Sequence, residues 1–306
     1  MPRRQISKKE KIMTNIAVIG LGSMGYGMAS SCLRAGHQVW GVDLNTAAVD
    51  RFVSAGGQSA ALPGDLHAVS VVVLNAPQTE AVLFGDDGVV AKLTPGAVVL
   101  GHATVPPAFA RDMAARCAAV GVHYLDAPIS GGAAKAASGE LSIMASGTAE
   151  AFAAAQPVLD ATAATVFELG DAAGAGSAMK AVNQLLAGVH IAAMAEALTF
   201  GMTQGVAPDK FVEVISKCAG TSWMLENRAP HIVAGDYTPL SQVNIWPKDL
   251  GIVLDIARDA KFSAPITAAA MQQFLAAAGM GLGGEDDAAV AKVYARNAGL
   301  ALPGED

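Results

Sequence analysis

Apolar residues in the first half of the chain form short continuous runs, separated by segments whose apolar residues recur at helical spacing. The runs cover residues 16–19, 39–42, 70–74, 97–100 and 123–127. Runs of this length are typical of parallel strands that are buried on both faces. Their alternation with helical segments predicts an α/β fold built on a Rossmann-type doubly wound sheet, with helices on both faces.

Two further runs, 141–145 and 165–169, flank a helical segment that begins near Thr148, and we expect them to continue the alternation. Helices are also expected over 46–54 and 108–119. Ligands in doubly wound sheets bind at the carboxyl ends of the strands. The residues that follow each run are therefore the first candidates for a functional site.

The pattern changes after about Gly170. Residues 174–204 are rich in Ala, Met and Leu at helical period and contain no proline. Thirty residues at 1.5 Å each make a helix of roughly 45 Å, which is long enough to connect two domains. Strand signals then disappear, and helices are expected from Pro208-Asp209 to Cys218, over 250–260 and over 267–278. The second domain is therefore predicted to be all-helical.

These patterns divide the chain into four parts. Residues 1–12 form a basic tail without the apolar segment of a secretory signal, and we expect the tail to be disordered. A sheet domain follows over 13–173, an interdomain helix over 174–204 and an all-helical domain over 205–306.

The loop after the first predicted strand has the spacing of a dinucleotide site. It consists of Gly20, Leu21, Gly22, Ser23, Met24 and Gly25. Gly20 would permit the tight strand-to-helix turn, Gly22 the close approach of a pyrophosphate, and Gly25 the packing of helix on sheet. The helix that follows would offer backbone N–H groups to the phosphates.

Asp43 ends the second predicted strand, 18 residues after Gly25, where an acceptor for a ribose diol is expected. Its charge would repel a 2′-phosphate, and neither Leu44 nor Asn45 is the arginine that such a phosphate requires. The sequence therefore predicts NAD rather than NADP.

Composition limits the classes of partner. The chain is 52% hydrophobic and 15% charged, with a formal net charge of -7, which argues against a nucleic-acid partner. No apolar run reaches the roughly 18 residues of a membrane span. The three cysteines (Cys32, Cys117 and Cys218) are dispersed, as in a reducing compartment, and no His or Cys set indicates a metal. We expect a soluble cytoplasmic protein.

Lys180, Asn183 and Gln184 would share one face of the long helix, because their spacings are three and four residues. A solvated helix edge and an acid/base lysine with an amide that holds substrate are both compatible with this pattern. A lysine suits proton transfer because burial or a nearby oxidised nicotinamide lowers its pKa.

Other polar positions have two interpretations each. Ser130, Gly131 and Gly132 could grip a carboxylate through backbone N–H groups and a hydroxyl, or form a plain turn. Lys248-Asp249 could be a surface ion pair, and His102 a loop histidine with satisfied hydrogen bonds. Ser222, Trp223 and His231 belong to a polar and aromatic cluster that could pack in the helical domain or line a pocket.

Four blocks in order resemble the β-hydroxyacid dehydrogenase family, which includes 3-hydroxyisobutyrate dehydrogenase and tartronate semialdehyde reductase. The blocks are 20–25, 126–132, 174–184 around Lys180, and 248–250. The resemblance covers the chain from Asn15 to about Tyr294 and implies a nicotinamide-binding sheet domain followed by an all-helical domain with the homodimer or homotetramer contacts.

The resemblance also implies roles for individual residues. Lys180 would be the catalytic acid/base, and Ser130 to Gly132 would hold the substrate carboxylate. Lys248, Thr104, Asn75 and Ala76 would lie beside the cofactor. Many members have Ser in place of Ala103 and Asn in place of Gln184, so the residue that holds the substrate, Asn183 or Gln184, stays open.

Several stretches, 103–110, 132–140 and 183–193 among them, are most similar to a branch that oxidises the C2 hydroxyl of four-carbon sugar acids with NAD. Ser222, Trp223 and His231 would then meet the polyol tail. The alternatives are a sibling dehydrogenase for 3-hydroxyisobutyrate, tartronate semialdehyde or D-erythronate, an imine reductase, and a non-catalytic NAD-binding regulatory protein.

Overall fold

The computed structural model describes residues 13–59 and 61–305, so the predicted disordered tail over 1–12 lies outside the described residues. The chain divides into two compact units, of which the first ends at Lys180 and the second begins at Ala181. The division falls inside the long helix that the sequence predicts between two domains.

The first unit contains a parallel sheet of five strands in the order β2-β1-β3-β4-β5. The strands are β1 (Asn15–Ile19), β2 (Gln38–Val42), β3 (Ala68–Val71), β4 (Val98–Gly101) and β5 (His123–Asp126). The chain leaves β1 for β2 on one side and returns to β3 on the other. Doubly wound sheets bind ligands at such a change of direction, which here falls at the carboxyl ends of β1 and β3.

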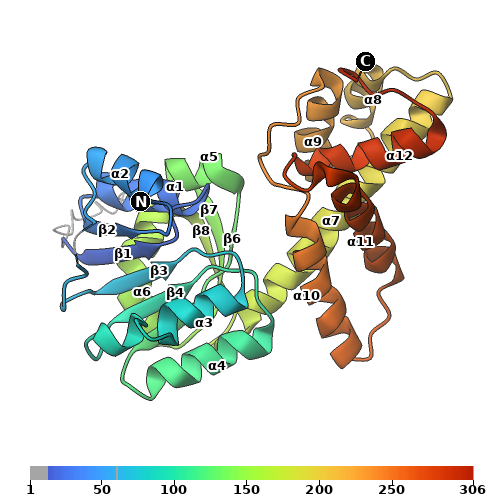
Figure 1. The fold of residues 1–306 in the computed structure, drawn as a ribbon. Coiled ribbons are helices and arrows are strands. Elements are labelled where there is room, and N and C mark those ends of the chain that lie inside the picture. Colours follow the sequence, from blue (N-terminus) through green and yellow to red (C-terminus); the bar gives the residue numbers. More distant parts are fainter. Residues whose placement is uncertain (1–12, 60, 306) are drawn as a thin grey trace, which may run out of the picture. The chain divides into compact units, whose positions relative to one another are not determined.

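Helices cover both faces of this sheet, as the alternating pattern predicts (Figure 1). Ile16 and Val18 of β1 pack with α1 (Gly25–Arg34) and α6 (Ala149–Thr162), whereas Ala17 and Ile19 belong to the core under α3 (Ala76–Phe84) and α4 (Pro107–Ala118). The two cores are therefore separated by the sheet. The remaining short elements before β4 are α2 (Thr46–Ser54) and η1 (Val90–Lys92).

A second, three-stranded sheet departs from the expected continuous alternation. It contains β6 (Ile129–Ser130), β7 (Leu141–Ala145) and β8 (Ala163–Glu168), with α5 (Gly132–Ser138) between β6 and β7. β6 pairs antiparallel with β7, because the chain reverses direction between these two strands, where α5 lies. Asp126 and Ser146 form an antiparallel bridge between the two sheets.

The strand expected over 70–74 is also wrong in its bounds, since β3 covers Ala68–Val71. The backbone N–H of Leu74 donates to the Gln78 side chain at 2.8 Å, and Asn75 caps α3. These contacts take residues after Val71 out of the strand and into the start of a helix.

Helices alone make up the described part of the second unit, apart from an isolated bridge between Gln242 and Asp286. They are α7 (Ala175–Thr203, which begins in the first unit), α8 (Pro208–Ile215), α9 (Trp223–Ala234), α10 (Ile245–Asp259), α11 (Pro265–Ala277), η2 (Ala278–Leu282), η3 (Asp287–Val290) and α12 (Ala291–Ala298). Ile191, Leu198, Trp246 and Phe274 are among the residues of one shared core.

One described helix, α7, has the length and composition of a membrane span, with a mean hydropathy of 1.5 over its most apolar window. The expectation that no segment would reach this threshold is therefore not met. Core helices of soluble proteins pass the same test, and 39% of the window is buried within the structure. The finding is weak evidence for a membrane.

Candidate active site

The predicted ligand-binding residues of the first unit follow the carboxyl ends of its strands. Gly20–Gly25 follow β1, Asp43 follows β2, Asn75 and Ala76 follow β3, Thr104 follows β4, and Ser130, Gly131 and Gly132 come at the end of β6, the short strand after β5. Because the five strands are parallel, these segments lie at one edge of the sheet. This is the edge at which doubly wound sheets bind ligands.

The three glycines after β1 are required for different reasons. Gly20 has a φ of +98°, and a Cβ on it would lie 2.2 Å from the carbonyl oxygen of Val72. A Cβ on Gly25 would lie 1.8 Å from the carbonyl oxygen of Gly20. A Cβ on Gly22 would meet no protein atom within 4 Å. Packing within the chain does not demand glycine at Gly22, whereas a pyrophosphate against the backbone would, so the loop fits a dinucleotide.

The carboxylate of Asp43 is fixed against this loop. Its Oδ2 accepts a hydrogen bond from the backbone N–H of Leu21 at 2.5 Å, and its Oδ1 accepts one from Asn45 at 2.8 Å. The nearest arginine along the chain, Arg51, stacks on the Tyr26 ring at 4.0 Å from its centroid. Asp43 thus places a negative charge at the loop, where a ribose diol is predicted to bind, while the guanidinium of Arg51 is engaged by Tyr26.

Asn75 has a structural role in addition to its predicted one. Its Oδ1 accepts a hydrogen bond from the backbone N–H of Gln78 at 3.0 Å and so caps α3, of which Ala76 is the first residue. Thr104 is half-buried in the loop between β4 and α4. Ser23 and Met24 lead from the glycine loop into α1.

His102, in the loop after β4, is a buried histidine with both ring nitrogens engaged. Nδ1 lies 2.7 Å from the carbonyl oxygen of Ala127, and Nε2 lies 3.2 Å from Oγ of Ser70. Burial lowers the pKa of His102 to about 4. The ring is therefore neutral near pH 7, and it donates from Nδ1 while Nε2 accepts the serine hydroxyl. This matches the satisfied loop histidine considered from the sequence.

The amine of Lys180 lies beside the segment predicted to hold a carboxylate. Lys180 is buried, with 9% of its surface exposed, and its Nζ donates to the carbonyl oxygen of Ile129 at 2.9 Å. Ser130 follows directly, and Gly131 and Gly132 have φ values of +133° and +75°, which favour glycine. The structure thus joins two sequence-predicted parts of a site that are about fifty residues apart in the chain.

Asp126, the last residue of β5, was not singled out from the sequence. It is 1% exposed and receives hydrogen bonds from the backbone of Gly174 and Ser177 and from the hydroxyls of Ser177 and Ser146. Burial raises the pKa of Asp126, and these hydrogen bonds oppose the rise. An acidic residue at the end of an apolar strand is the sequence signal that could have identified it.

In the second unit, four predicted or neighbouring residues form a hydrogen-bonded chain. Asn183 Nδ2 donates to Gln184 Oε1 at 2.9 Å, and Gln184 Nε2 donates to Asp249 Oδ2. Asp249 is 2% exposed, and its Oδ1 lies 2.5 Å from Nζ of Lys248. Lys248 is therefore paired with a buried acid rather than a surface one. From the sequence, Asp249 was considered only as the partner of Lys248 in a surface ion pair.

The remaining candidates belong to α9. Ser222 caps this helix by accepting the backbone N–H of Leu225 at 3.1 Å, and Trp223 is 60% exposed. His231 Nδ1 is buried and lies 3.4 Å from Oδ1 of Asp286. Ser222 and His231 thus have contacts within the helical unit, whereas the Trp223 ring is available at the surface of that unit.

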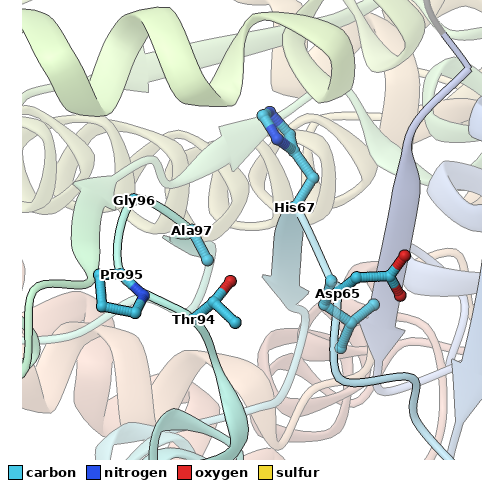
Figure 2. A pocket seen from close by; sticks show the side chains of 7 residues that line it. Asp65, His67, Thr94, Pro95, Gly96 and Ala97 are labelled. Atoms are coloured by element: carbon cyan, nitrogen blue, oxygen red, sulfur yellow. The ribbon is translucent and has the colours of Figure 1, made fainter.

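A hollow of about 300 Å³ lies at the opposite edge of the sheet, before β3 and β4. Asp65, His67 and Thr94 are among the residues that line it (Figure 2). His67 Nε2 is engaged by the carbonyl oxygen of Ala154 at 2.9 Å. The hollow lies at the amino ends of the strands, so it is not the dinucleotide site. Within the described residues, no group of three His, Cys, Asp or Glu side chains could hold a metal.

Two family models match the chain. The NAD binding domain of 6-phosphogluconate dehydrogenase matches residues 15–170. The family described as NAD-binding of NADP-dependent 3-hydroxyisobutyrate dehydrogenase matches residues 174–294. The two matches together account for nearly all of the described structure.

Relatives support the same assignment. An L-threonate dehydrogenase from Cupriavidus necator is 54% identical over 95% of this chain and 98% of its own length, and one from Haemophilus influenzae is 46% identical over 94% and 97%. The crystal structure of a 3-hydroxyisobutyrate dehydrogenase from Salmonella typhimurium is 46% identical, with a TM-score of 0.86 over 92% of this chain and 99% of that one. The chain therefore belongs to the 3-hydroxyisobutyrate dehydrogenase family and is an NAD-dependent hydroxyacid dehydrogenase.

Proposed function

We propose that the protein oxidises the C2 hydroxyl of L-threonate, giving 2-dehydro-L-erythronate, with NAD⁺ as the oxidant. The observation that carries this proposal is the buried amine of Lys180, which lies 2.9 Å from the carbonyl oxygen of Ile129 and next to Ser130. The choice of substrate rests on the L-threonate dehydrogenases, which share up to 54% of their residues with this chain.

The substrate carboxylate would bind at Ser130, Gly131 and Gly132. The two glycines adopt positive φ values, so the backbone turns without side chains that would shield its N–H groups. Backbone N–H groups in such a turn form a concave site for an anion, and the Ser130 hydroxyl adds a further donor. A carboxylate held there places the adjacent C2 close to the Lys180 amine.

Lys180 would act as general base. Neutral Lys180 takes the proton of the C2 hydroxyl as the C2–H bond breaks, and bound NAD⁺ supplies the chemistry of hydride acceptance. The products are the ketone, NADH and a protonated Lys180, which returns its proton to water. A positioned base of this kind contributes about 100- to 10,000-fold to the rate.

Of the two amides on α7, we assign substrate contact to Asn183. Both ends of the Gln184 amide are engaged, one by Asn183 and the other by Asp249. Asn183 follows Lys180 by three residues in the same helix, so helical geometry places the two side chains on one face. Gln184 would then orient Asn183 rather than hold the substrate.

The helical unit would supply the remaining contacts. Ser222, Trp223 and His231 are our candidates for the polyol tail, and Lys248 is our candidate for the cofactor. We further expect a cytoplasmic homodimer or homotetramer, as the family resemblance implies.

The proposal is tested by NADH production with a panel of hydroxy acids, with NAD⁺ and NADP⁺ compared. L-Threonate with NAD⁺ should give the highest kcat/KM. Lys180→Ala should lower kcat by about 100-fold or more while the Kd for NADH is unchanged, because the lysine acts on the proton and not on the dinucleotide. Lys210→Ala, at an exposed lysine paired with Glu213, is the control.

Near-normal turnover of Lys180→Ala would contradict the mechanism, and a preference for NADP⁺ would contradict the role of Asp43.

The panel should include 3-hydroxyisobutyrate as a second substrate, since the Salmonella typhimurium structure with 46% identity is titled 3-hydroxyisobutyrate dehydrogenase. A higher kcat/KM with 3-hydroxyisobutyrate than with L-threonate would favour that activity instead.

A further inference from the structure

The start of α7 is held by a buried carboxylate from a different element. Oδ2 of Asp126 accepts the backbone N–H groups of Gly174 at 2.9 Å and Ser177 at 2.8 Å. Oδ1 accepts the Ser177 hydroxyl at 2.6 Å. The first N–H groups of a helix lack partners within the helix, and its N-terminus carries partial positive charge. Asp126 therefore caps α7 from β5.

Ser146, at the end of β7, completes this contact. Its Oγ donates to Asp126 Oδ2 at 3.3 Å and accepts the backbone N–H of Gly176 at 2.9 Å. A Cβ on Gly176 would lie 2.4 Å from the carbonyl oxygen of Met144, so the helix backbone lies directly against the strand. Ser146 and Asp126 are 0% and 1% exposed, so water does not compete for these bonds.

The Lys180 amine is held by the neighbouring strands β6 and β7. Ile129, whose carbonyl oxygen accepts from Lys180 Nζ, belongs to β6 and pairs with Ile143 of β7. Lys180 follows Ser177 by three residues, a rise of about 4.5 Å along the helix. The backbone of Lys180 is thus located through Asp126 and its amine through Ile129, on strands joined by the bridge from Asp126 to Ser146.

From this geometry we infer that Asp126 is a positioning residue for catalysis, which acts through Ser177 and the start of α7 to set the place of the Lys180 amine. The inference rests on the proposed role of Lys180. Misplacement of a catalytic group by about 1 Å can cost about 100-fold in rate. Loss of the cap should therefore lower kcat, while the glycine loop after β1, which binds the dinucleotide, is left intact.

Two substitutions at this position separate geometry from charge. Asp126→Ala leaves two backbone N–H groups and two hydroxyls without their acceptor, and kcat should fall by about 100-fold with the KM for L-threonate little changed. Asp126→Asn can keep an oxygen at the Oδ2 position and turn its amide towards the Ser177 hydroxyl, which can accept. This variant should recover most of the lost kcat.

Ser177→Ala removes only the bond to Oδ1 and should lower kcat less than Asp126→Ala does. The matched control is Thr148→Ala, which removes the cap of α6 in the same unit, where Thr148 Oγ1 accepts the backbone N–H of Ala151 at 3.2 Å. The control should lose stability without loss of kcat. All variants should keep the Kd for NADH. Asp126→Ala should also shift the apparent pKa that the pH profile of kcat/KM gives for the catalytic base, Lys180.

Normal kcat in Asp126→Ala would overturn the inference. If Asp126→Ala does not fold, the inference is tested with Ser177→Ala. A normal kcat in Ser177→Ala would then overturn it. Lys180→Ala is assayed alongside to separate the two proposals. An active Lys180→Ala contradicts the proposed function, whereas an inactive Lys180→Ala with a fully active Asp126→Ala contradicts only the positioning role.

Discussion

For the buried residues near the strand ends, hydrogen-bond partners indicate whether a side chain has a structural or a catalytic role. Both ring nitrogens of His102 are engaged, by Ala127 and Ser70, so neither is left for a substrate. The amine of Lys180 instead contacts a carbonyl oxygen at the start of the segment predicted to bind a carboxylate. His102 should therefore affect stability, and Lys180 should affect turnover.

His102 gives a pH dependence of stability with a definite sign. Its pKa is lowered from 6.5 to about 4 in the folded protein, so protonation favours the unfolded chain. The contribution of neutral His102 to the free energy of unfolding is fully present above pH 6.5, and it is lost as the pH falls towards 4. Between pH 7.5 and pH 5 the loss is about 2 kcal/mol. Asn at this position can still donate to Ala127, so His102→Asn should remove this part of the pH dependence.

The measurement is urea unfolding of wild type and His102→Asn at both pH values. The wild type should lose about 2 kcal/mol more than the variant on acidification. Equal losses in the two proteins would show that another group titrates in this range and that His102 does not.

The sequence could identify residues whose type is required by contacts with nearby parts of the chain. Gly20 and Gly25 exclude a Cβ because of backbone atoms in or next to their own loop, and Asp43 contacts that loop after one helix and one strand. Asp126 and Asp249 also have partners that are 48 to 65 positions away in the chain. The sequence placed Asp126 at the end of a strand and Asp249 beside Lys248, but it could not identify these distant partners.

At the scale of elements, apolar runs located most strands, but ends that depend on side-chain capping were predicted less well. The strand over 70–74 was shifted because Asn75 and Gln78 begin a helix there. Helix α9 was not predicted at all, since it contains Pro230 and begins in a polar cluster at Ser222. Propensity disfavours proline inside a helix, yet burial of Leu225 and Ile232 on one face stabilises this one.

Two glycines in helices provide a paired test of packing against helix propensity. A Cβ on Gly188 of α7 would lie 2.9 Å from both Leu250 and Trp246 of α10, whereas a Cβ on Gly251 of α10 would meet nothing within 4 Å. Gly251→Ala should stabilise the protein by about 0.5–1 kcal/mol. Gly188→Ala gains the same propensity but crowds the interface between α7 and α10, at a cost of about 1–3 kcal/mol.

Urea unfolding of the two variants checks this contrast, with expected changes of opposite sign. If both substitutions stabilised the protein equally, close packing of α10 on Gly188 would be contradicted. Turnover of Gly251→Ala with L-threonate serves as a check that the substitution leaves the fold unchanged.

At the scale of the whole molecule, the two units have separate cores and separate polar clusters. The first contains the glycine loop, Asp43 and the contact between Lys180 and Ile129. The second has a buried ionic cluster in which Arg228 Nε lies 2.5 Å from Asp287 and 3.9 Å from Asp286, with both acids fully buried. Trp246 Nε1 donates to the other oxygen of Asp287 at 2.9 Å. Loss of this ionic cluster should therefore destabilise the second unit and leave the first unit folded.

Arg228→Met tests this separation, because it keeps an apolar stem and removes the cation from between two buried acids. Removal of one partner of a buried ion pair costs about 3–5 kcal/mol. Burial already raises the pKa of Asp287 and Arg228 opposes that rise, so the variant should bind a proton there more readily. Its destabilisation should consequently be larger at pH 8 than at pH 5.

Hydrogen exchange shows which part of the chain is destabilised by Arg228→Met. In Arg228→Met, protection should fall over residues 181–305, whereas the glycine loop and Asp43, which belong to the other unit, should keep their protection. Lys210→Met, which breaks an exposed ion pair with Glu213, should cost less than about 1 kcal/mol and serves as the control. An equal loss of protection in the first unit would mean that the two units unfold as one. A cost no greater than that of Lys210→Met would mean that Arg228 does not compensate the buried acids.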